Sequence, residues 1–163
     1  LLDDAAVVTA MAYVDLNPVR AGTAQDIPHS DYTSAQDRLE AITQTTQDED
    51  AMRPALLPFS GADWDGAPCA LPFHLQDYLE LLDETGRIVR DDKPDFIDGA
   101  TPRLLAQLGV VPGEWLMTVT TLQARYELAM GAPERLRGLA TAWAAKWVRG
   151  VGFARRLYSA PTQ

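Results

Sequence analysis

The chain has 163 residues, 47% of them hydrophobic, which is enough for a buried core in one domain or two small ones. Its formal net charge of −9 argues against a surface that binds DNA nonspecifically everywhere. The single cysteine excludes an internal disulfide, and no apolar run approaches the roughly 20 residues that a membrane span requires. These features favour a cytoplasmic protein that makes no membrane contact.

Charge is distributed unevenly along the chain. Residues 1–100 hold 6 basic and 20 acidic residues, whereas residues 101–163 hold 8 basic and 3 acidic ones. No acidic residue follows Glu134. A basic C-terminal third suits contact with a polyanion, and it is equally suited to neutralising the acidic part within the fold.

The N-terminal stretch, residues 1–11, has the pattern of an amphipathic helix. Asp3 or Asp4 can cap its start, and both favour the positive end of the helix dipole. Residues that recur at helical spacing predict the buried stripe of this helix. They are Val7, Met11 and Val14.

Two polar side chains mark the end of this predicted helix. Tyr13 and Asn17 lie four residues apart, so we expect their side chains one turn from each other on a second face. Pro18 is expected to end the helix, because it lacks an N–H and clashes with the preceding turn. From residue types alone, a structural interpretation is open: the phenol covers the edge of the core and the amide caps the turn.

The ten residues from Tyr13 to Gly22, YVDLNPVRAG, resemble the signature of the REP-associated tyrosine transposases. These are relatives of the single-tyrosine HUH transposases of small insertion sequences. The family pattern is Tyr, three residues, Asn, Pro, an aliphatic residue, a basic residue, any residue and Gly, and every position is filled here. Looser similarity indicates a C-terminal extension of one subfamily. It runs through residues 31–34, 71–73, 78–81 and 90–93.

The resemblance implies an enzyme that cleaves and rejoins single-stranded or hairpin DNA through a 5′-phosphotyrosine intermediate. Tyr13 would be the nucleophile, and Asn17 would be a ligand or an orienting group for a divalent metal, Mg²⁺ or Mn²⁺. An ordinary phenol, with a pKa of about 10, is a poor nucleophile at neutral pH, and a hard cation beside it would stabilise the developing charge. Arg20 would face the phosphate as a bidentate donor, with capping of the helix end as its alternative role.

The family also uses two histidines that flank one large apolar residue on a neighbouring strand, and this sequence lacks that pattern. Its two histidines, His29 and His74, are far apart, and we interpret both as surface or capping residues. Because the chain begins at Leu1 within an apparent helix approach, we expect the C-terminal portion of a longer protein or a truncated remnant. Such a chain would be inactive alone and would bind no metal tightly.

The middle of the chain is acidic and rich in proline and glycine. A short helix is predicted over residues 34–43, followed by a polar, acidic loop over residues 43–53. Two Leu-Pro-Phe units then predict extended segments, with Phe59 and Phe73 as anchors on the core.

The last part of the chain is predicted to be helical. Gly86 and Gly109 are the expected ends of two helices, and Trp143 and Trp147 are expected on the apolar stripe of the final one. The first two of the last three helices could form a helix-turn-helix, but the second carries only one basic residue and is a poor DNA reader. The expected helices span residues 74–85, 102–108, 114–130 and 134–149.

The final segment is the predicted nucleic-acid contact, because its cations could neutralise several phosphates and give salt-sensitive, sequence-independent affinity. The residues expected to do so are Lys146, Arg149, Arg155 and Arg156.

The predicted fold class is therefore mainly α: a C-terminal helix of a transposase α/β domain followed by a helical extension. Residues 1–30 would be the helix and tail of the transposase domain, residues 31–70 an acidic connector, and residues 71–163 the extension. The alternative is a non-catalytic helical interaction module that keeps the motif as a structural helix end. The sequence leaves a homodimer open.

Overall fold

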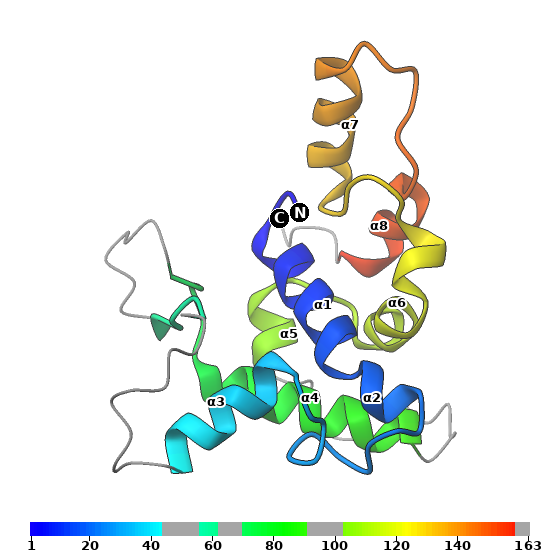
Figure 1. Ribbon diagram of the computed structural model, residues 1–163. Coiled ribbons are helices and arrows are strands. Elements are labelled where there is room, and N and C mark those ends of the chain that lie inside the picture. The colour runs from blue at the N-terminus through cyan, green and yellow to red at the C-terminus, as the bar shows by residue number, and fades with distance from the viewer. Residues whose placement is uncertain (44–55, 62–69, 91–102, 159–163) are drawn as a thin grey trace. The chain divides into compact units, whose positions relative to one another are not determined.

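The structure is a computed structural model that describes residues 1–43, 56–61, 70–90 and 103–158 (Figure 1). These residues form α-helices, and their β-pairing is limited to two isolated bridges, so the mainly helical prediction is confirmed. No helix among them is both long and apolar enough to cross a membrane. Most of the predicted acidic loop, residues 44–53, lies outside the described residues. The helices are α1 (Asp4–Asp15), α2 (Asn17–Arg20), α3 (Ser34–Thr43), α4 (Leu75–Arg90), α5 (Arg103–Gln107), α6 (Pro112–Arg125), α7 (Pro133–Ala142) and α8 (Val151–Leu157).

The chain divides into two compact units. Unit 1 comprises residues 1–13 and 94–163, and unit 2 comprises residues 14–93. The division falls within α1, so this helix contributes its first three turns to one unit and its end to the other.

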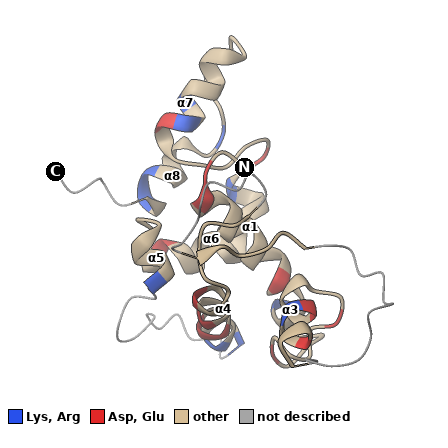
Figure 2. Cartoon of the chain, turned by 90° about the vertical axis from the view of Figure 1, so that its left-hand side faces the viewer, with Lys and Arg blue, Asp and Glu red and all other residues tan. Residues whose placement is uncertain are grey.

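Helix α4 supplies much of the core of unit 2. Figure 2 shows acidic residues along this helix, of which Glu80, Asp83 and Glu84 are exposed. Its residues Tyr78, Leu81 and Leu82 are fully buried. The expectation that Gly86 ends this helix was wrong, because α4 continues to Arg90. A Cβ at Gly86 would stand 3.3 Å from a methyl group of Leu16, so this glycine permits a close approach that offsets its low helix propensity.

The two Leu-Pro-Phe segments lie side by side in unit 2. Phe59 and Leu71 form a parallel bridge, in which the Leu71 N–H donates to the carbonyl of Pro58 at 2.8 Å. The Phe59 and Phe73 rings meet edge to face with centroids 5.3 Å apart, a favourable aromatic geometry. Phe73 is buried and Phe59 half-buried, which confirms the predicted anchoring.

Unit 1 joins the start of α1 to α5, α6, α7 and α8. Asp3 is the joint: its carboxylate accepts hydrogen bonds from the Ala6 N–H at 2.9 Å, the Ala132 N–H at 2.6 Å and the Tyr158 hydroxyl at 2.7 Å. The predicted cap of the first helix is thereby confirmed at Asp3. Beyond α1, the fully buried apolar side chains of this unit are Leu104, Leu105, Trp115, Val119, Leu136, Ala154 and Leu157.

Three helices end in the same backbone pattern, the Schellman motif. After α2 and α5, the residue with positive φ is Gly22 (φ 70°) or Gly109 (φ 61°), and the two bonds that close the last turn are present in both. After α7 that residue is Ala144, with φ 52°. Its N–H donates to Thr141 at 3.1 Å, and the next N–H donates to Ala140 at 2.9 Å.

The end of α7 corrects the prediction of one helix over residues 134–149. The helix stops at Ala142, and α8 begins at Val151 after an irregular segment. The sequence indicated no end here, because alanine favours a helix interior and rarely takes the left-handed conformation.

Candidate functional site

The motif residues form two helices, because α1 ends at Asp15 and α2 begins at Asn17. The prediction that Pro18 ends the first helix was wrong. Leu16 separates the helices, and Pro18 occupies the first turn of α2, where its missing N–H costs nothing and its fixed φ is already helical. The turn of α2 is completed by a hydrogen bond in which the Arg20 N–H donates to the carbonyl of Leu16 at 2.9 Å.

The predicted buried stripe of α1 was also wrong. Val14 is 59% exposed, and Val7 and Met11 are only half-buried. This helix is apolar on nearly every side, so spacing alone did not select its inner face. The fully buried positions of α1 are Ala6, Val8, Thr9, Ala12 and Asp15.

The three motif side chains with predicted chemical roles differ in exposure. Tyr13 lies in the last turn of α1 and is half-buried, Asn17 begins α2 and is exposed, and Arg20 ends α2 and is half-buried. The boundary between the two compact units falls between Tyr13 and Val14.

Asp15, within the motif, is the polar residue that the sequence analysis missed. Its fully buried carboxylate accepts hydrogen bonds from the Tyr78 hydroxyl at 2.7 Å, the Ser34 hydroxyl at 3.0 Å and the Ala35 N–H at 3.3 Å. It thus ties the end of α1 to α4 and to the first turn of α3, where the helix dipole favours a negative charge. A charged residue at the end of a helix whose interior is almost entirely apolar was the available signal.

The surroundings of Asp15 shift the ionisation of two neighbours. Burial, followed by the charge of Asp15, raises the pKa of Tyr78 well above its usual value, so this phenol stays protonated and remains a donor. Burial lowers the pKa of Arg38, whose guanidinium donates to the Leu57 carbonyl at 2.9 Å and lies 4.6 Å from the centre of the Phe59 ring. The hydrogen bonds around Asp15 have a structural role, because they connect three helices within unit 2.

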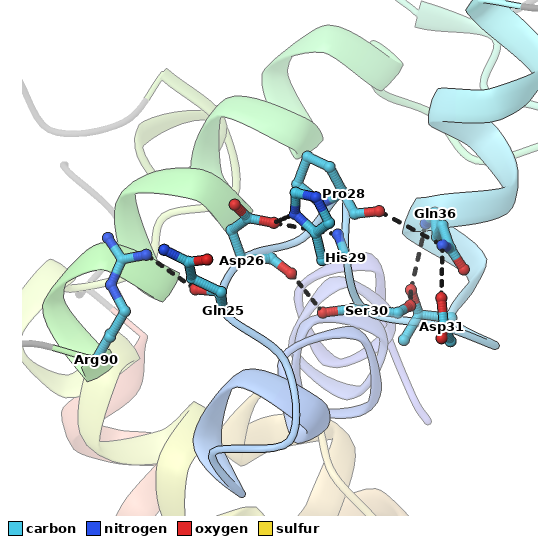
Figure 3. A network of polar contacts seen from close by, with 9 residues as sticks. Gln25, Asp26, Pro28, His29, Ser30, Asp31, Gln36 and Arg90 are labelled. Carbon is cyan, nitrogen blue, oxygen red and sulfur yellow. Dashed lines mark hydrogen bonds and ion pairs between the residues drawn. The ribbon is translucent and has the colours of Figure 1, made fainter.

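The two histidines occupy structural positions. His29 is exposed and bonds through its ring and its N–H to Asp26, in a loop where Ser30 also bonds to the Asp26 backbone (Figure 3). The bond with His29 lowers the pKa of the Asp26 carboxyl below its usual value. His74 directly precedes α4, and its ring lies against Gly61.

A divalent-metal site needs several oxygen or nitrogen ligands that converge on one point. Among the residues that the structure describes, no three His, Cys, Asp or Glu side chains gather in this way. Asn17 is exposed, and the sequence holds no His-x-His. The described residues therefore bring together no set of ligands like the one that the resemblance implies, and we derive no step through a metal.

The predicted DNA-contacting cations lie on α2, on α8 and in the segment before α8, and Figure 2 shows the basic colour on α8. Lys146 and Arg155 are exposed. Arg149 is exposed as well, and its guanidinium donates to the Ala124 carbonyl at 2.7 Å. Arg156 lies 3.6 Å from a Glu114 carboxylate oxygen and over the Phe153 ring. Arg149 and Arg156 are thus partly engaged within unit 1.

The two tryptophans predicted for the core of the last helix are exposed instead. Because α7 ends early, Trp143 is 53% and Trp147 74% exposed. Together with the 77% exposed Leu128, they line a groove of about 180 Å³ within unit 1. Its other lining residues are Glu127, Ala145, Val148 and Arg149.

The chemistry available to the described residues is therefore found in two places. One is the motif, with its half-buried phenol, and the other is the tryptophan-lined groove. Comparisons with protein-family models, with curated proteins and with solved structures gave no match. Function has to be inferred from the residues and their contacts.

Proposed function

We propose that this chain carries the nucleophile segment of a single-tyrosine transposase that cleaves and rejoins single-stranded DNA. The observation that carries the proposal is the stretch from Tyr13 to Gly22, which fills every position of the REP-associated tyrosine transposase pattern. The histidine pair of such an enzyme would come from a chain segment outside these 163 residues.

In the proposed reaction, the Tyr13 hydroxyl oxygen attacks the phosphorus of a DNA phosphodiester. A bond forms between the tyrosine oxygen and phosphorus as the bond from phosphorus to the 3′ oxygen breaks. The phenol proton ends on the departing 3′ oxygen, which leaves a 5′-phosphotyrosine and a free 3′-hydroxyl. Attack by a 3′-hydroxyl on the phosphotyrosine reverses these bonds and rejoins the DNA.

The placement of Tyr13 is compatible with this role. It lies in the last turn of α1, two residues before the buried Asp15 that fixes the end of this helix. A nucleophile gains from a position on a rigid element, because its geometry then does not have to be ordered during the reaction.

The test is a covalent adduct with DNA in the longer protein that adds a His-x-His strand to this chain. Incubated with labelled single-stranded DNA and Mg²⁺ or Mn²⁺, that protein should give a band that survives denaturation and disappears in Tyr13→Phe. Tyr32→Phe is the matched control, because Tyr32 is a fully exposed tyrosine outside the motif. An adduct that persists in Tyr13→Phe would overturn the assignment of the nucleophile.

A second candidate is a non-catalytic helical interaction module, and one observation favours it. Pro18 lies in the first turn of α2 and Gly22 supplies the positive φ after its end, so part of the motif is explained by local folding. This candidate predicts that the longer protein forms no adduct with any DNA strand under the same conditions.

A further inference from the structure

The groove lined by Leu128 and the two tryptophans exposes large apolar side chains to water. Trp143 and Trp147 each leave more than half of their surface in water, although tryptophan is the largest apolar side chain available to a core. An exposed apolar patch of this kind marks a binding surface more often than an isolated exposed side chain does.

The backbone that carries the tryptophans is fixed at both ends. Ala144 holds the left-handed turn that ends α7, and Val148 is buried. At the far end, Gly150 has φ 106°, and a Cβ there would stand 2.5 Å from the Tyr126 ring, so only glycine fits. The groove is thus presented in one arrangement, which lowers the entropy that a ligand has to overcome.

The charge of this segment indicates what kind of ligand fits. Lys146 lies in the chain between the two tryptophans, and Arg149 lines the groove. The acidic residue of the lining, Glu127, lies 3.9 Å from Arg149, which partly neutralises it. The sequence contains no acidic residue after Glu134 but six basic ones: Arg135, Arg137, Lys146, Arg149, Arg155 and Arg156.

We propose that this groove binds unpaired bases of single-stranded DNA, which stack on Trp143 and Trp147 while Lys146 and Arg149 contact the phosphates. Aromatic platforms beside cations are the common means of binding single strands without reading their sequence. Paired bases cannot expose their faces to the tryptophans, so duplex DNA should bind more weakly. The choice of DNA as the single strand rests on the proposed function.

The experiment is a binding titration of the full chain with a labelled 20-nucleotide oligo-dT, followed by fluorescence anisotropy at low salt. Trp143→Ala and Trp147→Ala should each weaken binding roughly tenfold or more, while Trp147→Phe should retain most of it because phenylalanine still stacks. Tyr32→Ala, which removes an exposed aromatic residue outside the groove, should bind like the wild type. All variants should melt close to the wild type, because both tryptophans are more than half exposed.

Three results would overturn the proposal. They are wild-type affinity in both tryptophan-to-alanine variants, equal affinity for a duplex of the same length, and no binding by the wild type at low salt. Self-association of the chain that is lost in Trp147→Ala would instead assign the groove to a second copy.

The binding assay does not depend on DNA cleavage, so the two proposals can fail separately. If the wild-type longer protein forms no adduct while the tryptophan-dependent binding is retained, the proposed function alone is refuted. Binding that is insensitive to the tryptophans, beside an adduct that depends on Tyr13, would refute the groove alone.

Discussion

Replacing Ala144 by glycine is expected to stabilise the protein, because Ala144 occupies the left-handed position after α7 that glycine takes without strain. Ala144 has φ 52°, in the left-handed region. An L-residue with a Cβ in this region costs roughly 1–2 kcal/mol, which glycine avoids. Glycine in turn costs about 0.5–1 kcal/mol more conformational entropy on folding.

The net gain for Ala144→Gly is therefore about 0.5–1 kcal/mol in the free energy of unfolding. For a chain of this length, that gain corresponds to an increase in Tm of roughly 1–4 °C. Ala144 is exposed, so no packing term complicates the comparison.

The matched control is Ala142→Gly, two residues earlier. Ala142 is equally exposed but is the last residue of α7, so glycine there should cost about 0.5–1 kcal/mol and lower Tm. Both variants can be followed by thermal melts in circular dichroism. If Ala144→Gly lowers Tm as much as Ala142→Gly, the left-handed turn is absent and α7 continues toward Trp147.

Two further substitutions test the buried polar groups. Asp15→Ala leaves the buried hydroxyl of Tyr78 without its acceptor and should lower the free energy of unfolding, measured by urea denaturation, by about 2–4 kcal/mol. The control Val14→Ala, at the neighbouring exposed position, should change it by no more than about 0.5 kcal/mol. Equal effects of the two variants would refute the stabilising role of the Asp15 hydrogen bonds. The buried Tyr126 hydroxyl has no hydrogen-bond partner among the described residues, so Tyr126→Phe should be neutral or stabilising at pH 7, and a clear loss of stability there would contradict this. Because burial raises the pKa of Tyr126 to about 12, folding favours its neutral form, and this contribution is fully present below pH 10 and lost as pH rises from 10 to 12. Tyr126→Phe should remove that part of the alkaline loss in a series of melts between pH 9 and pH 12.

The sequence predicts a helix end where the residue type matches the backbone that the end requires. Gly109 was expected to end α5 and does so, because glycine takes positive φ without strain. Ala144 makes the same turn without a comparable signal, since alanine is the strongest helix former. Because the end of α7 was not predicted, both tryptophans were expected on a buried stripe, whereas the structure exposes them in a groove.

A similar limit applies to contacts between residues far apart in the chain. The partners of Asp15 lie on α3 and α4, and its bond to Tyr78 spans 63 residues. Periodicity indicates which residues share a face of one helix, but it does not indicate which other element covers that face. Gly86 illustrates the same point, because only the approach of Leu16 explains a glycine inside α4.

The motif itself separates into residues that folding explains and residues that it does not. Pro18 lies in the first turn of α2, Val19 is the buried residue of this helix, and Gly22 supplies the positive φ that follows its end. Asn17 is exposed at the start of α2, where its side chain makes no helix cap. Stability measurements on α2 would therefore not distinguish the two candidate functions, since both require the same helix. The distinction lies in the chemistry of Tyr13, which the adduct experiment reports directly.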